Sequence, residues 1–169
     1  AGVATPLEIS AEIGNPQTRA NDPHLSDYDK KKFVTDDVIK ISKTGSTDVN
    51  YKRTAAGNWT PSVPTTPMTT TGSGETFTAT FPNDFSSILL DQGTPANFWK
   101  SNRLTATATA TGNRVSFSFA PAACKITIIV SFQVDNSSGS AKVTGKGLCT
   151  GNATEETITL LKTCLLYTS

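Results

Sequence analysis

The chain has 169 residues, of which 36% are hydrophobic and 17% charged, and its formal net charge is +1. A nearly neutral chain lacks the basic field that attracts nucleic acid or an anionic membrane surface, so we expect no nucleic-acid partner. A chain of this length buries roughly 70% of its unfolded surface in one core and does not require disulfides. Its many Thr, Ser, Gly and Pro residues favour short strands over helices.

The N-terminal residues predict a strand followed by an exposed loop. Apolar and polar residues alternate strictly over residues 7–13, which places on one buried face Leu7, Ile9, Ala11 and Ile13. The Gly-Asn-Pro sequence at 14–16 ends this strand. The polar segment 17–23 is then expected to be a surface loop, where proteases cut most readily.

The middle of the chain offers further segments of the same kind. The sequence predicts strands over residues 37–42, 49–53 and 75–81, and a helical turn within 92–102. Between them, the prolines and the Thr-Gly-Ser tract of residues 61–74 predict a surface loop.

Residues 103–134 contain the most regular alternation and are predicted to form the core. Apolar residues recur at every second position through 104–110, 115–119 and 124–134, a pattern typical of strands with one buried face. A tight hairpin turn is expected at Gly112-Asn113. With two more strands at 141–144 and 156–161, the total reaches about eight to ten short strands, which predicts an all-β protein built as a β-sandwich.

The sequence predicts no catalytic, cofactor-binding or metal-binding residue, and therefore no enzyme. The chain has no nucleophile-elbow motif, no glycine-rich phosphate loop and no cluster of metal ligands. The only histidine, His24, lies in the polar loop, and a hydrolase that uses it remains an alternative. The spacing of Cys124, Cys149 and Cys164 is typical of neither a zinc site nor a disulfide framework.

Three aromatic residues suggest a second kind of function. Aromatic faces stack on sugar rings, so Tyr51, Trp59 and Trp99 are candidate glycan contacts of a surface carbohydrate-binding module. The competing interpretation is that aromatic residues at strand positions belong to the core.

Several short motifs follow one another along most of the chain. In order they are Thr18-Arg19-Ala20, 33–41 (Phe-Val-Thr-Asp-Asp-Val-Ile-Lys-Ile), Val49-Asn50-Tyr51, Gly57-Asn58-Trp59, 77–82 (Phe-Thr-Ala-Thr-Phe-Pro), Asp91-Gln92, 97–102 (Asn-Phe-Trp-Lys-Ser-Asn), 115–119 (Val-Ser-Phe-Ser-Phe) and 125–128 (Lys-Ile-Thr-Ile). In this order and spacing they resemble the fimbrillin family of Bacteroides-type bacteria, the subunits of protease-assembled pili.

The resemblance implies a transthyretin-like β-sandwich with Greek-key-type connections, in a lipoprotein precursor exported to the outer-membrane surface. There it would belong to a fimbrium and contribute to cell adhesion. An Arg-specific surface protease would cleave between Arg19 and Ala20 and release the strand of residues 7–13. A strand donated by another pilus subunit would then fill the vacated groove. The alternative is that residues 7–13 form a permanent edge strand and that Arg19 is an ordinary loop residue.

The resemblance also implies a division of the chain. Residues 1–20 would be a propeptide-like N-terminal strand with its processing loop, and residues 21–163 the N-terminal fimbrillin-like β-sandwich. Family members usually carry a second β-sandwich domain, which we expect to be missing here. Residues 164–169 resemble translated sequencing-adapter read-through and are expected to be a non-native tail.

Overall fold

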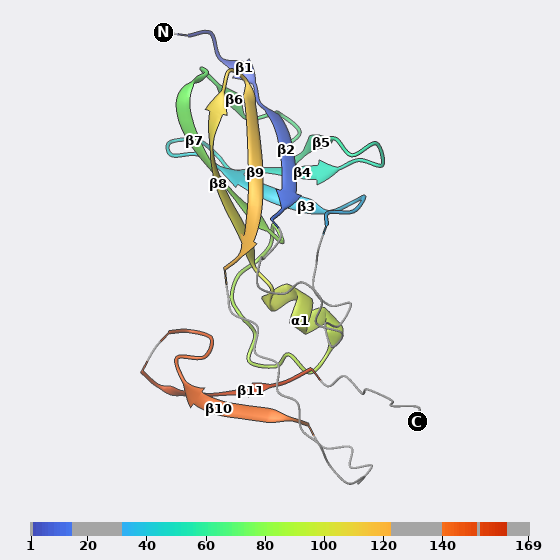
Figure 1. Ribbon diagram of the computed structural model, residues 1–169, viewed down its shortest axis with the longest axis vertical. Coiled ribbons are helices and arrows are strands. Elements are labelled where there is room, and N and C mark those ends of the chain that lie inside the picture. Colours follow the sequence, from blue (N-terminus) through green and yellow to red (C-terminus); the bar gives the residue numbers. More distant parts are fainter. Residues whose placement is uncertain (1, 15–31, 123–139, 152, 162–169) are drawn as a thin grey trace. The chain divides into compact units, whose positions relative to one another are not determined.

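A computed structural model describes residues 2–14, 32–122, 140–151 and 153–161, apart from the side chain of Ser73. The chain forms two compact units, residues 1–85 with 103–122 and residues 86–102 with 123–169. Within these described residues, strands make up most of the regular structure and one short helix the rest, in agreement with the predicted all-β class (Figure 1).

The first unit is built on one mixed sheet of seven strands. In spatial order these are β2 (Glu8–Ile13), β9 (Arg114–Pro121), β8 (Leu104–Thr111), β7 (Ser73–Phe81), β3 (Val38–Ser42), β4 (Val49–Arg53) and β5 (Trp59–Val63). Every neighbouring pair is antiparallel except β2 and β9, which run parallel. The sheet curls until its two edge strands, β2 and β5, approach each other (Figure 1).

The hairpin of β8 and β9 confirms the prediction for the regular part of the core. Thr111 pairs with Arg114, which leaves Gly112 and Asn113 as a two-residue turn. Gly112 has φ +61° and Asn113 does not have a positive φ, the pattern of a type II′ turn. Along β9, Val115, Phe117 and Phe119 are buried while the residues between them are exposed. The predicted continuation over 124–134 lies outside the described residues.

The core of this unit contains a group of aromatic rings around Phe33. The Phe33 ring meets three others edge-on, with centroid distances of 5.3 Å to Trp59, 5.5 Å to Phe81 and 5.1 Å to Phe119. Because these partners come from β5, β7 and β9, one side chain outside the strands connects distant parts of the curled sheet. Edge-to-face ring pairs add about 0.5–1.5 kcal/mol each beyond the burial of their surface.

The prediction that residues 61–74 form a surface loop is wrong for much of that segment. Pro61 belongs to β5, an edge strand of the sheet, where a proline can be tolerated because one side of the strand need not donate to a ladder. Met68 and Thr70 are buried. Thr69 and Thr70 form β6 (Thr69–Thr70), which pairs antiparallel with β1 (Thr5–Pro6) in a separate two-stranded sheet.

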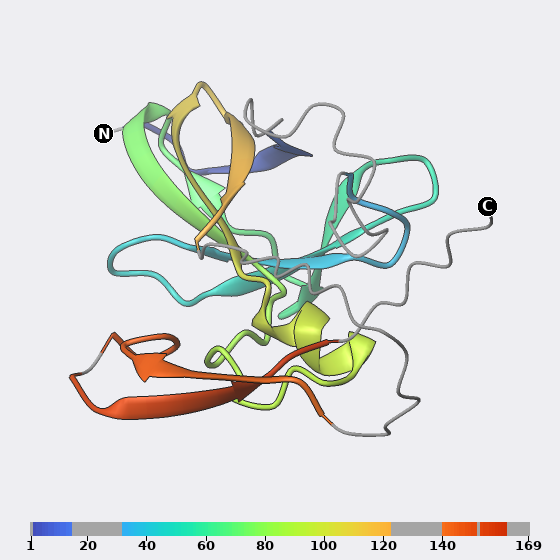
Figure 2. The same ribbon diagram turned by 60° about the horizontal axis from the view of Figure 1, so that its bottom comes forward.

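The second unit contains the one helix and one hairpin that are described there. Helix α1 (Pro95–Ser101) begins after Thr94, whose hydroxyl accepts a hydrogen bond from the Asn97 N–H, and so confirms the predicted helical turn. Strands β10 (Lys142–Lys146) and β11 (Glu155–Thr159) pair antiparallel, as Figure 2 shows, near the two positions predicted for strands. Among the described residues no helix is long and apolar enough to cross a membrane.

Candidate functional site

The candidate site is the groove that holds the chain's own N-terminal strand. This strand, residues 5–13, comprises β1 and β2. Among the strands of the described residues, β2 lies at one edge of the main sheet and is hydrogen-bonded there to β9. The parallel register pairs Ile9 with Val115, Ala11 with Phe117 and Ile13 with Phe119. The apolar residues of both strands therefore share one face of the sheet, as the alternation in the sequence indicated.

This apolar face packs against the core. Leu7, just before β2, is 5% exposed, and Ile9, Ala11 and Ile13 are partly buried against the buried cluster. Shifting the register by one residue would turn the whole set toward solvent, so burial fixes the register of β2 on β9. Fully burying one large aliphatic side chain contributes roughly 1.5–3 kcal/mol, a value that applies to Leu7 and is an upper bound for the others.

The outer face of the same pair is polar and exposed. Arg114 Nε donates to Glu8 Oε2 at 2.9 Å, and the hydroxyls of Ser10 and Ser116 are 2.8 Å apart. The hydrogen bond from Arg114, and then one from Asn113, lowers the pKa of Glu8. Both partners of the ion pair are mostly exposed, and exposed pairs of this kind contribute little to stability.

The N-terminal strand also pairs with a second sheet. Before β2 begins, Thr5 and Pro6 pair with Thr70 and Thr69 of β6, and the Leu7 N–H donates to Met68 O at 2.8 Å. One residue later the Glu8 N–H donates to Asn113 O at 2.8 Å, on the β9 side. The strand thus changes its hydrogen-bonding neighbour between Leu7 and Glu8, from an antiparallel partner to a parallel one.

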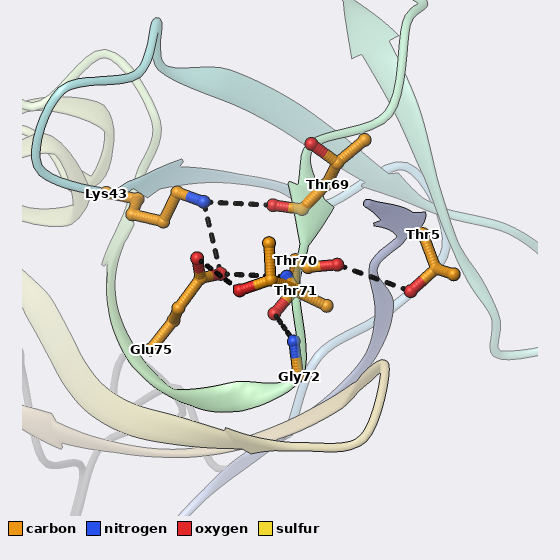
Figure 3. Close-up of polar contacts among 7 residues, drawn as sticks. All are labelled: Thr5, Lys43, Thr69, Thr70, Thr71, Gly72 and Glu75. Carbon is orange, nitrogen blue, oxygen red and sulfur yellow. Dashed lines mark hydrogen bonds and ion pairs between the residues drawn. The ribbon is translucent and has the colours of Figure 1, made fainter. Parts of the chain in front are cut away.

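A cluster of polar residues holds β6 in place. This cluster, which we call the Glu75 cluster, consists of Lys43, Thr69, Thr70, Thr71, Gly72 and Glu75 (Figure 3). Lys43 Nζ donates to Thr69 O and to Glu75 Oε2, each at 3.1 Å. The Thr71 hydroxyl donates to Glu75 Oε1 at 3.1 Å, and the Gly72 N–H donates to Thr70 Oγ1 at 3.0 Å.

The contacts of the Glu75 cluster favour the ionised form of the Glu75 carboxyl group. A hydrogen bond from the Thr70 side chain, followed by the contact with Lys43, lowers the pKa of Glu75 to about 2. The side chains of Lys43 and Glu75 are 18% and 25% exposed, so this ion pair is far less accessible to water than that of Glu8 with Arg114. Such a pair orders the backbone beside it more effectively than an exposed one.

The aromatic residues proposed as glycan contacts are not gathered on an exposed face. Tyr51 is 1% exposed, and its Oη accepts a hydrogen bond from the Met68 N–H at 2.9 Å; burial raises the pKa of this phenol. Trp59 is 8% exposed and packs against Phe33. Trp99 lies on α1 in the second unit. With the rings of Tyr51 and Trp59 turned into the core, the sequence-based reason for a sugar-stacking face no longer holds.

Other candidate residues lie outside the described part of the chain. These are Arg19 and Ala20 of the predicted cleavage site, His24 of the hydrolase alternative, and the cysteines Cys124 and Cys164. Within residues 2–14, 32–122, 140–151 and 153–161, no group of three or more His, Cys, Asp or Glu residues is placed to hold a metal ion.

The sequence analysis missed β1, β6 and the Glu75 cluster. Its strongest available signal was the β-branched run at 69–71, because threonines favour strands. The prolines before that run and the glycines after it favoured a loop instead.

No protein-family model, curated protein or solved structure matches this chain.

Proposed function

We propose that this protein is a structural subunit or accessory protein of cell-surface pili of the Bacteroides type, assembled by exchange of its N-terminal strand. An Arg-specific surface protease cleaves at Arg19–Ala20, the strand of residues 5–13 leaves, and a strand from another subunit takes its place. The subunit is an exported lipoprotein at the outer-membrane surface, where the fimbrium contributes to adhesion. Its fold is a transthyretin-like β-sandwich with Greek-key-type connections.

The observation that carries this proposal is the position of β2. Among the strands of the described residues, β2 lies at the edge of the main sheet and pairs there with β9, so it can be replaced without separating any other pair in that sheet, and only the short β1–β6 pair separates with it. Its pairing with β9 is parallel, which is slightly less stable per residue than antiparallel pairing. Arg19 follows β2 in the sequence, so a cut there would leave the strand held by noncovalent contacts alone.

The energetics also support exchange rather than simple loss. Without β2, the inner face of β9 with Phe117 and Phe119 would lose part of its cover, and the edge of β9 would lack a partner for its backbone groups. An apolar groove beside an unpaired edge is costly in water. An added strand with matching alternation restores both the burial and the ladder, which is the general mode of β-strand addition. Subunits that add in this way grow head to tail.

The proposal is tested by cleaving the protein and supplying a strand in trans. The chain is treated with an Arg-specific protease in the presence of a fluorescent peptide with the sequence of residues 1–14. We expect the cleaved chain to take up the peptide, seen as a rise in fluorescence anisotropy, and the Arg19→Ala variant to stay uncut between residues 14 and 31 and to take up none. Resistance of the Arg19–Ala20 bond to the protease would contradict the processing step.

A reversible crosslink provides the matched control for exchange. The Ser10 and Ser116 hydroxyls lie 2.8 Å apart, so a Ser10→Cys/Ser116→Cys pair is positioned to form a disulfide between β2 and β9. The pair is built in a background with Cys124→Ser, Cys149→Ser and Cys164→Ser. After cleavage, the oxidised protein should take up no peptide and the reduced protein should take it up, whereas Ser10→Cys alone should do so under both conditions. Equal uptake by the oxidised and reduced forms would contradict exchange at this groove.

A further inference from the structure

We infer that the groove recognises its strand in two parts, and that the part on β6, ordered by the Glu75 cluster, selects which strand can fill the groove. The inference rests on the proposed function for its biological setting. The partner that fits is an extended segment of another subunit, long enough to pair with β6 before it runs along β9. A strand that carries only the alternation of residues 8–13 should fill half of the groove.

The two parts are distinct in direction and in chemistry. On β9 the strand runs parallel, and its side chains at alternate positions meet Val115, Phe117 and Phe119. On β6 it runs antiparallel, and its side-chain contact there is polar: Thr5 Oγ1 donates to Thr70 O at 3.3 Å. The strand changes from β6 to β9 between two consecutive residues, Leu7 and Glu8. An incoming strand must therefore match the contacts on β6 and those on β9 in a single register.

Leu7 marks the point where the two parts meet. Its N–H donates to Met68 O, and its side chain is buried in the core. Met68 is itself held by the Tyr51 hydroxyl through its own N–H. A large aliphatic residue at this position of the incoming strand therefore serves as the anchor, and the backbone that receives it is ordered from inside the core.

The Glu75 cluster fixes the β6 part from the other side. Strand β6 has only two residues, and among the described strands its partner is β1. So short a strand depends on neighbouring contacts for its conformation. Lys43 binds the Thr69 carbonyl, and the Glu75 carboxylate accepts the Thr71 N–H at 3.4 Å, so contacts flank β6 at both ends (Figure 3). The cluster thus holds the Thr70 carbonyl in place for Thr5.

The β6 part also restricts which residue the incoming strand can carry near its start. A Cβ atom at Gly2 would lie 2.8 Å from the carbonyl oxygen of Thr71, closer than real Cβ contacts. The opposing atom belongs to the backbone of Thr71, a residue of the Glu75 cluster, and cannot simply rotate away. We therefore expect the fitting partner to have glycine at the position that corresponds to Gly2.

Amide hydrogen exchange on the intact chain tests the role of the cluster. In Glu75→Gln, the Leu7 N–H, which bonds to Met68 on the β6 side, should exchange about tenfold faster, the effect of losing one hydrogen bond to a charged group. The Gly14 N–H, which bonds to Phe119 on β9, should keep its rate. The control is Lys52→Gln, which removes an exposed ion pair with Asp36 and should change neither rate. Equal acceleration of both amides, or of neither, would overturn the two-part groove.

Peptide binding tests the selection itself. In the full chain, residues 17–19 are replaced by the site of a specific protease, so that strand exchange no longer depends on cleavage at Arg19. We expect a peptide of residues 1–14 to dissociate at least about tenfold more slowly than one of residues 7–14, and Glu75→Gln to abolish this difference while Lys52→Gln preserves it. Equal dissociation rates for the two peptides in the unmodified groove would overturn the inference. If neither peptide enters the cut chain, the proposed exchange fails, and the amide measurement still decides whether the groove has two parts.

Discussion

The two halves of the groove around residues 5–13 are stabilised in different ways. The half on β9 consists of apolar side chains in a regular register, with a weak ion pair on its outer face. The half on β6 is a two-residue pairing ordered by charged and hydroxyl groups. Burial supplies affinity to any strand with the right alternation, whereas oriented polar groups discriminate among strands. The groove therefore combines a half on β9 that accepts many strands with a half on β6 that selects among them.

The largest expected effect comes from the inner face of β9. Phe117 is 1% exposed and lies opposite Ala11, so Phe117→Ala should lower the free energy of unfolding by about 3–5 kcal/mol through lost burial and the cavity left behind. Urea denaturation followed by tryptophan fluorescence measures this change. The neighbouring Ser116→Ala, on the exposed face, should stay within about 0.5 kcal/mol. Equal effects of the two substitutions would mean that the inner face of β9 is not part of the core.

Substitution of the anchor between the halves should have the next largest effect. Leu7→Ala removes a buried side chain at the point where the strand changes partners, and we expect a loss of about 2–3 kcal/mol in the free energy of unfolding, in the lower part of the range for such changes. Val3→Ala is the control, because that side chain is 85% exposed and its loss should have almost no effect. A Leu7 substitution as mild as that of Val3 would mean that the strand contributes little to the folded state.

Acid should weaken the β6 half in particular. An unfolded chain protonates Glu75 near its usual pKa of 4.5, whereas the folded chain keeps the carboxylate charged down to about pH 2. The stabilisation is therefore complete above pH 4.5 and lost as the pH falls toward 2. Urea midpoints measured across this range should fall less steeply for Glu75→Gln, which has no carboxylate to titrate. Parallel pH profiles for the two proteins would show that Glu75 is not held in its charged form.

The smallest effect is expected from the exposed ion pair on the outer face of β2 and β9. Side chains of Arg114 and Glu8 are 79% and 58% exposed, so Arg114→Gln should leave the urea midpoint almost unchanged. Any residual difference should disappear on adding salt, because exposed charges are screened. A loss as large as that of Leu7→Ala would mean that this pair, rather than burial, holds the strand on β9.

The same contrast explains how much could be predicted from the sequence. Strand β2 and the hairpin of β8 and β9 carry strict alternation, and a period of two indicates both the strand and its buried face. The pairing of Thr5 with Thr70 joins positions 65 residues apart, and no local pattern indicates such a partner. Prolines and glycines around β6 favoured a loop, and the fit of Pro61 into an edge strand depends on the curled sheet.

The parallel direction of β2 was also beyond prediction from sequence. Alternation specifies which side chains are buried, but it is the same in either direction along the strand. The direction follows from where the strand changes partners, with β6 before Leu7 and β9 after it. Tyr51 and Trp59, the candidate glycan contacts, show a different limit of sequence-based prediction. Their residue types were compatible with either a sugar-binding face or the core. In the structure, Trp59 packs against Phe33 and Tyr51 bonds to Met68, which places both in the core.

Native mass spectrometry measures whether another strand can displace residues 5–13 from their groove. The chain cut at an engineered site between residues 14 and 31 is incubated with an isotope-labelled peptide of residues 1–14, and the mass of the noncovalent complex is followed over time. We expect the labelled peptide to replace the original fragment in a one-to-one complex, and the oxidised Ser10→Cys/Ser116→Cys protein to keep its own fragment. If the protein without the crosslink retains its unlabelled fragment even at a large excess of peptide, residues 5–13 are a permanent part of the fold and strand exchange is wrong.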